Sequence, residues 1–173
     1  MTKTNFALKI HLVLWLTVSC ACSNSSANLP PNCQIDKIVV LKSQRKMMVY
    51  QNNQLLKTYT IALGLQPVGK KHFEGDYKTP EGNYYIESKN QHSAYHRNLG
   101  VSYPNAQDQS YAKAKNKRAG GEIKIHGLGK KQQQFGKLHF LVDWTHGCIA
   151  VDNQEIEELY KHVAIGTPID IEP

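Results

Sequence analysis

Long apolar runs and early acidic residues are both missing from this 173-residue sequence. A membrane-spanning helix needs about 20 consecutive apolar residues, and the apolar run at 10–18 is too short to serve as one. The hydrophobic share of 40% and the charged share of 20% are typical of a folded protein and exclude a disordered chain. The length is that of one ordinary domain.

Acidic side chains are absent before Asp36, while Lys3 and Lys9 precede the apolar run and small residues follow it. A basic start, a short apolar stretch and small residues are the pattern of a secretory signal. We therefore expect an exported protein of the periplasm or cell envelope.

The residues at 17–20 resemble a bacterial lipobox, in which Cys20 would become the lipidated first residue. Cys22 is a second candidate of the same kind, and residues 25–27 would suit an ordinary signal peptidase. Any membrane attachment would therefore come only through a lipid anchor. The expected organisation is a signal or lipobox region at 1–22, a linker at 23–34 rich in Ser, Asn and Pro, and a folded catalytic domain at 35–173.

Cysteine is scarce, and no two of the four cysteines form a C-x-x-C pair. This spacing disfavours a zinc ribbon and a thioredoxin-type motif. Cys20, Cys22 and Cys33 crowd the N-terminal region, where Cys22 and Cys33 could pair if processing spares Cys22. Cys148 stands alone deep in the domain, as a candidate nucleophile or as a small buried apolar residue.

The formal net charge of +7 favours anionic surroundings, such as an acidic cell-wall polymer. The lysines are spread along the chain, and no RRM, KH or zinc-finger pattern accompanies them. We therefore expect no nucleic-acid partner.

Short β-branched and alternating segments dominate from residue 35 onward. They predict strands at 38–41, 47–50, 55–63, 83–87, 122–125, 138–142 and 169–171, with helices at 107–118 and 153–163. The expected fold is a mostly-β sandwich or barrel with one or two short helices.

Two segments carry chemistry: His126-Gly127, and Thr145 to Cys148. A thiol attacks as its thiolate and needs a base beside it, for which imidazole is the natural choice. His146 would reach Cys148 only across a turn, whereas His126 can arrive on a neighbouring strand. The competing hypothesis is a zinc site built from His126, His146 and Cys148. The spacing of the histidines disfavours this hypothesis.

These residues resemble the signature of the L,D-transpeptidase catalytic domain (YkuD type), which has a His-Gly and later a Ser/Thr-x-Gly-Cys. The resemblance covers nearly all of 36–172, and the segments 143–145 and 149–151 are most similar to the YafK-like branch. Further blocks similar to the family lie at 64–70, 75–82, 103–105 and 166–168.

The resemblance implies a peptidoglycan L,D-transpeptidase that needs no cofactor and no metal. Cys148 would attack a stem tetrapeptide, release D-Ala and pass the acyl group to an amine, either a diaminopimelate or a lipoprotein lysine. His126 would carry the protons, the Gly127 carbonyl would orient its ring, and the N–H groups of Gly147 and Cys148 would face the oxyanion. Substrate-pocket candidates are Thr145, His146, Tyr95, His96 and Arg97.

One position departs from the family pattern: Ala150 stands where many relatives have an arginine two residues after the cysteine. Arg97 or Arg118 would then have to supply such a contact from elsewhere. This departure keeps a hydrolase of the same family as an alternative, one that cleaves protein–peptidoglycan or stem-peptide linkages. A non-catalytic peptidoglycan-binding lipoprotein is a third reading.

Overall fold

A computed structural model describes residues 28–173 of the chain, the side chain of Lys137 excepted. The predicted signal or lipobox region, including Cys20 and Cys22, and the first part of the linker lie outside the described residues. In the part of the chain described, no helix is long and apolar enough to cross a membrane.

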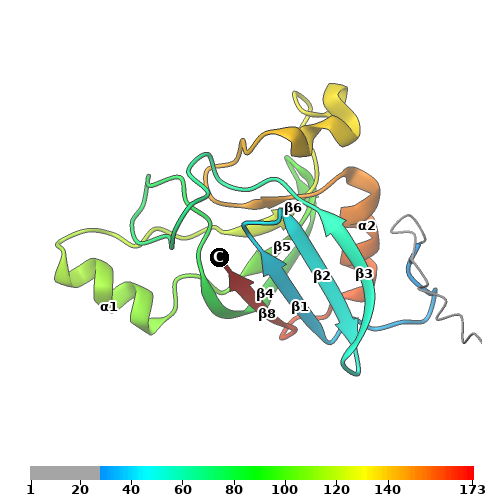
Figure 1. The fold of residues 1–173 in the computed structure, drawn as a ribbon, viewed down its shortest axis with the longest axis horizontal. Helices are drawn as coiled ribbons and strands as arrows, with labels where there is room; N and C mark the ends of the chain where they lie inside the picture. The colour runs from blue at the N-terminus through cyan, green and yellow to red at the C-terminus, as the bar shows by residue number, and fades with distance from the viewer. Residues whose placement is uncertain (1–27) are drawn as a thin grey trace, which may run out of the picture.

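Eight strands form one sheet that curls around the core (Figure 1). The order across the sheet is β3-β2-β1-β8-β4-β5-β6-β7. The strands are β1 (Lys37–Leu41), β2 (Lys46–Gln51), β3 (Gln54–Thr60), β4 (Gly82–Ser93), β5 (His96–Val101), β6 (Lys124–His126), β7 (Ile149–Ala150) and β8 (Pro168–Glu172).

The two ends of this sheet meet, because the chain that leaves β3 runs alongside β7. Ala62 and Ala150 exchange two backbone hydrogen bonds of 3.0 and 2.8 Å. Further along, the Leu65 N–H donates to the Thr145 carbonyl over 2.9 Å. These bonds bring the predicted nucleophile segment against the first hairpin of the chain, so the mostly-β expectation is confirmed as a curled half-barrel.

Helix α2 (Asn153–His162) packs on β5 beside the sheet, and its sequence explains both its start and its buried side. Asp152 caps the helix in a reciprocal capping box with Glu155. Ile156 and Leu159 are fully buried in the core. Helix α1 (Ala106–Ala114) begins in the same way, at Asn105, and lies at the other end of the molecule (Figure 1).

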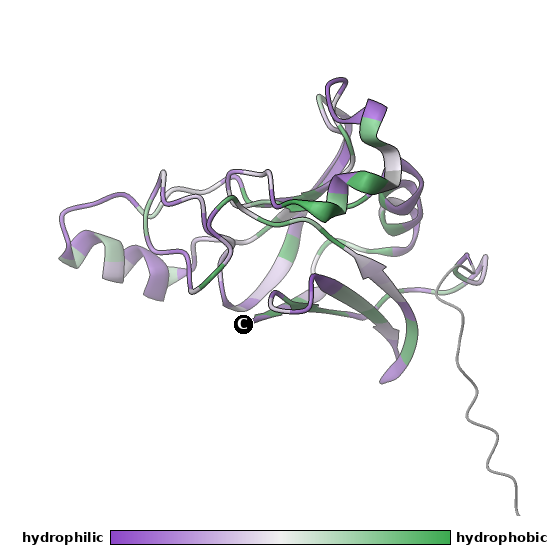
Figure 2. Cartoon of the chain, turned by 45° about the horizontal axis from the view of Figure 1, so that its top comes forward, coloured by the Kyte–Doolittle hydropathy of each residue, from purple (hydrophilic) through white to green (hydrophobic). Residues whose placement is uncertain are grey.

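The predicted strand at 138–142 is wrong, because the chain there forms the irregular 3-10 segment η1 (Gln133–Leu141). The apolar residues of 138–142 suggested a strand, but Leu138, Leu141 and Val142 are all exposed. Figure 2 colours parts of this helical segment green, as hydrophobic. No neighbouring strand is within reach of this segment, and Gly136 turns the chain with φ 48.

Strand β5 was not predicted from the sequence. The strand predicted at 83–87 is β4, which continues six residues further, to Ser93. The two strands form a long antiparallel hairpin with two register shifts. These shifts interrupt the alternation of polar and apolar residues that marks a strand. The hairpin places β5 next to β6, which ends at His126.

Candidate active site

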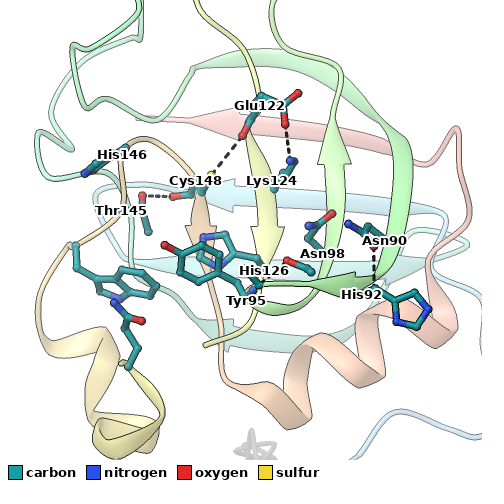
Figure 3. A pocket seen from close by; sticks show the side chains of 14 residues that line it. Asn90, His92, Tyr95, Asn98, Glu122, Lys124, His126, Thr145, His146 and Cys148 are labelled. Atoms are coloured by element: carbon teal, nitrogen blue, oxygen red, sulfur yellow. Dashed lines mark hydrogen bonds and ion pairs between the residues drawn. The ribbon is translucent and has the colours of Figure 1, made fainter. Parts of the chain in front are cut away.

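His126, at the end of β6, and Cys148, directly before the neighbouring parallel strand β7, line one cavity of about 560 Å³ (Figure 3). β6 ends at His126, and β7 begins directly after Cys148. In the register, Ile125 faces Ile149 and His126 faces Ala150, so Cys148 lies level with Lys124. The neighbouring-strand position expected for His126 is therefore the one that the structure has.

The His126 ring is held in one tautomer by its own loop. Its Nδ1 lies 2.7 Å from the Gly127 carbonyl oxygen. A carbonyl only accepts hydrogen bonds, so Nδ1 carries the proton and Nε2 keeps a free lone pair. Burial lowers the pKa of His126 to about 4, because the charged ring would lose its hydration. At neutral pH the ring is therefore neutral and able to accept a proton at Nε2.

The Cys148 thiol is partly buried and protonated at rest. Its Sγ donates to the Glu122 carbonyl oxygen over 3.5 Å. Burial raises the pKa of Cys148, while a hydrogen bond from the Lys124 backbone N–H and the charge of the Lys124 side chain act in the opposite direction. The site thus rests as a neutral thiol and a neutral imidazole, and proton transfer has to accompany nucleophilic attack.

Thr145 fixes the tight turn that presents Cys148. Its Oγ1 accepts the Gly147 N–H over 3.0 Å and donates to the Cys148 carbonyl over 2.8 Å. Gly147 has φ +127, and a Cβ there would lie 2.6 Å from the Lys78 carbonyl oxygen. Both the backbone conformation and the close approach of Lys78 therefore require glycine at this position.

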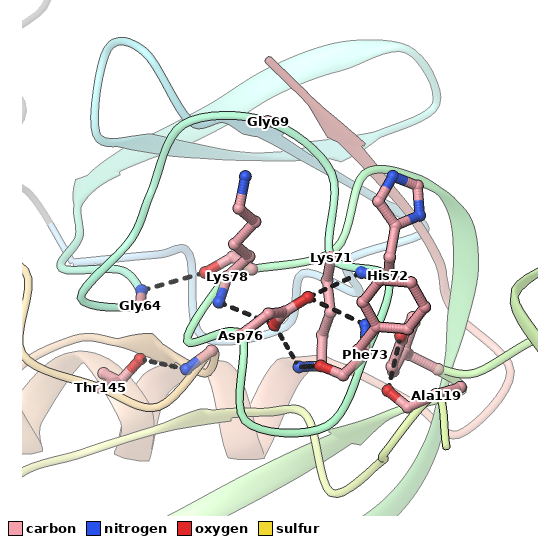
Figure 4. Close-up of polar contacts among 12 residues, drawn as sticks. Gly64, Gly69, Lys71, His72, Phe73, Asp76, Lys78, Ala119 and Thr145 are labelled. Atoms are coloured by element: carbon pink, nitrogen blue, oxygen red, sulfur yellow. Dashed lines mark hydrogen bonds and ion pairs between the residues drawn. The ribbon is translucent and has the colours of Figure 1, made fainter. Parts of the chain in front are cut away.

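The loop around Lys78 is itself fixed by the carboxylate of Asp76 (Figure 4). Burial would raise the pKa of Asp76, but hydrogen bonds from the Lys71 ammonium and from nearby backbone N–H groups outweigh it and hold the pKa below its ordinary value. Lys71 Nζ lies 2.7 Å from Asp76, and the His72 N–H 2.8 Å. This network holds the loop in place behind Gly147.

Gly127 lets the His126 loop pack directly on α2. A Cβ at Gly127 would lie 2.6 Å from Asn153 Oδ1 and 2.8 Å from Ile156. The same Asn153 oxygen accepts the Leu128 N–H over 2.7 Å. The carbonyl that orients the His126 ring is therefore positioned by the first turn of the helix.

Two aromatic rings pack against His126. The Tyr95 ring centroid lies 4.7 Å from that of His126, and the Trp144 centroid lies 5.6 Å away, edge-on. Tyr95 was expected in the pocket, whereas the role of Trp144 was not foreseen from the sequence. Its position directly before Thr145, in a segment already similar to the family, was the available signal.

His146 is exposed, and its ring points away from the thiol (Figure 3). The ring packs edge-on against Tyr77 at 5.0 Å and lines both the Cys148 cavity and a neighbouring one of about 520 Å³. No group of three His, Cys, Asp or Glu suited to hold a metal ion occurs in residues 28–173. The competing zinc interpretation therefore gains no support.

The structure places His96 and Arg97 outside the lining of the cavity, which corrects their assignment to the pocket. His96 Nε2 lies 2.7 Å from Glu157, and Arg97 Nε lies 2.8 Å from the same carboxylate. The Arg97 guanidinium also stacks on Tyr160, 4.8 Å from its centroid. At the start of β5 these two side chains are turned towards α2 rather than towards Cys148.

Ala150 is fully buried, between His126 on β6 and Ala62 on the opposite end of the sheet. An arginine side chain has no space there. Arg118, the other candidate, is 85% exposed, pairs with Glu74 and lines the neighbouring cavity. Neither of the two predicted arginines therefore lines the cavity of Cys148.

Comparison with known proteins identifies the family. The L,D-transpeptidase catalytic domain (YkuD) matches residues 35–171, and the chain belongs to this family. The chain is 29% identical over 134 residues to "Putative L,D-transpeptidase YafK" of Escherichia coli K12, covering 73% of this chain and 46% of that protein. This similarity agrees with the YafK-like branch expected from the sequence.

Solved structures agree with the fold. The helical cell shape determining protein Pgp2 of Campylobacter jejuni superposes with a TM-score of 0.60 at 25% identity, covering 87% of this chain and 51% of that one. Bd1075 of Bdellovibrio bacteriovorus gives a TM-score of 0.56 at 27% identity, covering 80% and 48%. The chain thus spans about half the length of these relatives.

Proposed function

We propose that this protein is a peptidoglycan L,D-transpeptidase in which Cys148 forms a thioester with a stem tetrapeptide. The observation that carries the proposal is the placement of Cys148 and His126 on adjoining strands at one cavity, with the Gly127 carbonyl leaving His126 Nε2 free to accept a proton. Membership of the L,D-transpeptidase family supports peptidoglycan stem peptides as the substrate class.

In the first half-reaction, Cys148 Sγ attacks the carbonyl carbon between diaminopimelate and the terminal D-Ala. The thiol proton passes to His126 Nε2 as the S–C bond forms. The C–N bond then breaks, and Nε2–H returns the proton to the departing amine of D-Ala. The product is a thioester on Cys148, with His126 neutral again and the thiol proton carried away on the D-Ala amine.

In the second half-reaction, an acceptor amine gives a proton to His126 Nε2 and attacks the thioester carbonyl carbon. The S–C bond then breaks, and Nε2–H returns the proton to Cys148 Sγ, which regenerates the thiol. A diaminopimelate amine of a second stem would give a cross-link, and a lipoprotein lysine would give an anchored protein. The Cys148 N–H is the better candidate for the oxyanion, because the Gly147 N–H already donates to Thr145 Oγ1. Gly147 then acts chiefly by permitting the turn.

Export to the cell envelope is part of this proposal, as the family's substrate requires it. Lipidation at Cys20 stays a prediction, tested by globomycin, which should block maturation of a lipoprotein. Mature protein of unchanged mass in treated and untreated cells would contradict lipidation.

The test is incubation of the protein with tetrapeptide muropeptides, with products identified by mass spectrometry. New cross-linked dimers together with free D-Ala are the expected result, and Cys148→Ala gives neither. Loss of linked species without new dimers would instead indicate a hydrolase. Binding without any turnover would contradict an enzymatic function and favour a peptidoglycan-binding lipoprotein.

A further inference from the structure

One lysine and no arginine line the Cys148 cavity in the described part of the chain, and that lysine is Lys124. Side chains two apart on a strand point the same way, so Lys124 and His126 share one side of β6 while Ile125 between them is buried in the core. On β5 the residue opposite Lys124 is Gly100. The Lys124 side chain is 33% exposed and lines the cavity, so its ammonium is accessible from the cavity.

The charge of Lys124 acts on both proposed catalytic groups. It favours the thiolate of Cys148 and opposes protonation of His126. This common influence agrees with the register, in which Lys124 lies level with Cys148. A negatively charged substrate group next to the scissile carbonyl would meet this ammonium.

Lys124 forms an ion pair with the carboxylate of Glu122, and a carboxylate of the substrate could replace Glu122 in this pair. The Glu122 side chain is 87% exposed, against 33% for Lys124. An ion pair with one partner in water is weak, because solvent screens it and the exposed side chain loses conformational freedom in making it. A substrate carboxylate in the cavity can therefore take the place of Glu122.

We propose that Lys124 binds the carboxylate of the residue that leaves during formation of the thioester. The identity of that residue rests on the proposed function, in which it is the terminal D-Ala. Lys124 is thus a specificity-determining residue: it selects a peptide that ends one residue beyond the scissile bond. Arg118 is the rival cation, since it lines the neighbouring cavity, which shares Glu122 and His146 with this one.

The first test uses two thiol reagents and requires no peptidoglycan. Iodoacetate carries a carboxylate and iodoacetamide does not, so their ratio of alkylation rates at Cys148 measures the local attraction for a carboxylate. We expect Lys124→Met to lower this ratio roughly fivefold, the size of one close charge pair in a well-hydrated site. Lys124→Arg should keep the ratio, and so should the control Lys113→Met on α1.

An unchanged ratio in Lys124→Met would overturn the proposal. If the ratio instead falls in Arg118→Met and not in Lys124→Met, the carboxylate contact lies in the neighbouring cavity, and the proposal is overturned as well. Thermal unfolding of each variant serves as the control for folding, and Lys124→Gln provides a second neutral substitution.

The second test compares a stem tetrapeptide with its C-terminal amide. The wild type should prefer the free acid about tenfold in kcat/KM through a lower KM, and Lys124→Met should lose this preference. An unchanged preference in Lys124→Met contradicts the inference and leaves the proposed function standing. No turnover of either peptide by the wild type contradicts the proposed function, and the alkylation ratio then decides on Lys124 by itself.

Discussion

Residues 28–173 contain two cysteine–histidine pairs in different surroundings, Cys148 with His126 in the cavity and Cys33 with His162 beside α2. In the second pair, His162 Nδ1 lies 2.8 Å from the Cys33 carbonyl oxygen and 3.5 Å from Cys33 Sγ. Because the carbonyl accepts, this nitrogen carries a proton and cannot take another from the thiol. In the cavity, Gly127 binds the proton-bearing Nδ1 of His126 instead, and Nε2 remains a base.

The charges around the two thiols also differ. Burial raises the pKa of Cys33, and the carboxylate of Glu158 raises it further. Burial raises the pKa of Cys148 too, but Lys124 opposes that shift. The same two residue types therefore form a candidate nucleophile in one place and a structural contact in the other. The two pairs differ in which ring nitrogen is engaged and in the sign of the charge that acts most strongly on the thiol.

The largest difference should appear in turnover. His126→Asn keeps a donor for the Gly127 carbonyl but has no base, so we expect turnover of muropeptides to fall about 10³-fold. Cys148→Ala should have no turnover. His162→Asn and Cys33→Ala should stay within about twofold of the wild type, and a comparable loss in either would erase the distinction between the pairs.

A second prediction concerns stability and pH. The folded-state pKa of His126 is about 4, against 6.5 in the unfolded chain, so between these values the unfolded state binds more protons. This residue should therefore contribute stability that is complete above pH 6.5 and lost as the pH falls towards 4, by up to about 3 kcal/mol. Urea unfolding at pH 4.5 and pH 7 measures the free energy of unfolding at each pH. The difference between the two free energies should be smaller in His126→Asn than in the wild type.

A third prediction concerns the resting thiol of Cys148. Because its pKa is raised, alkylation by iodoacetamide should increase about tenfold from pH 7 to pH 8 and continue to rise at higher pH. Peptide mass spectrometry resolves modification at Cys148 from that at Cys33. A plateau already at neutral pH would mean a stable thiolate–imidazolium pair.

The smallest effect is expected at Cys33. Glu158→Gln removes the charge that helps to raise its pKa, so Cys33 should react about threefold faster at pH 8 while Cys148 does not change. Glu157→Gln is the matched control one residue away, since Glu157 pairs with His96 and Arg97 instead. An equal increase in both variants would indicate loosening of α2 rather than an electrostatic effect.

Much of this arrangement was predictable from the sequence, and the exceptions have physical causes. Continuous β-branched and alternating runs predicted β1 to β3, and the capped apolar stripe predicted α2. Strand β5 was missed because its first half, 96–98, is entirely polar and because Gly100 is a weak strand former. The strand predicted at 138–142, within η1 and just after it, rested on a short run of mostly apolar residues, which does not by itself show whether a sheet covers them.

The site shows the same division. His126 and Cys148 belong to short local motifs, and β6 with His126 lies next to β7, which follows Cys148. Trp144 and Lys124 reach the cavity because the fold brings distant segments of the chain together. No local sequence pattern reveals which distant segments meet. Arg97 failed as a pocket candidate because its direction depends on the position of Glu157 on α2.

The most direct test of the central claim is the mass of the intact protein after brief mixing with a stem tetrapeptide. We predict an adduct equal to the tetrapeptide minus alanine, located on Cys148, removed by hydroxylamine as a thioester and absent from Cys148→Ala. Free D-Ala released equally by the wild type and by Cys148→Ala, with no adduct on either, would contradict the assignment of Cys148 as the nucleophile.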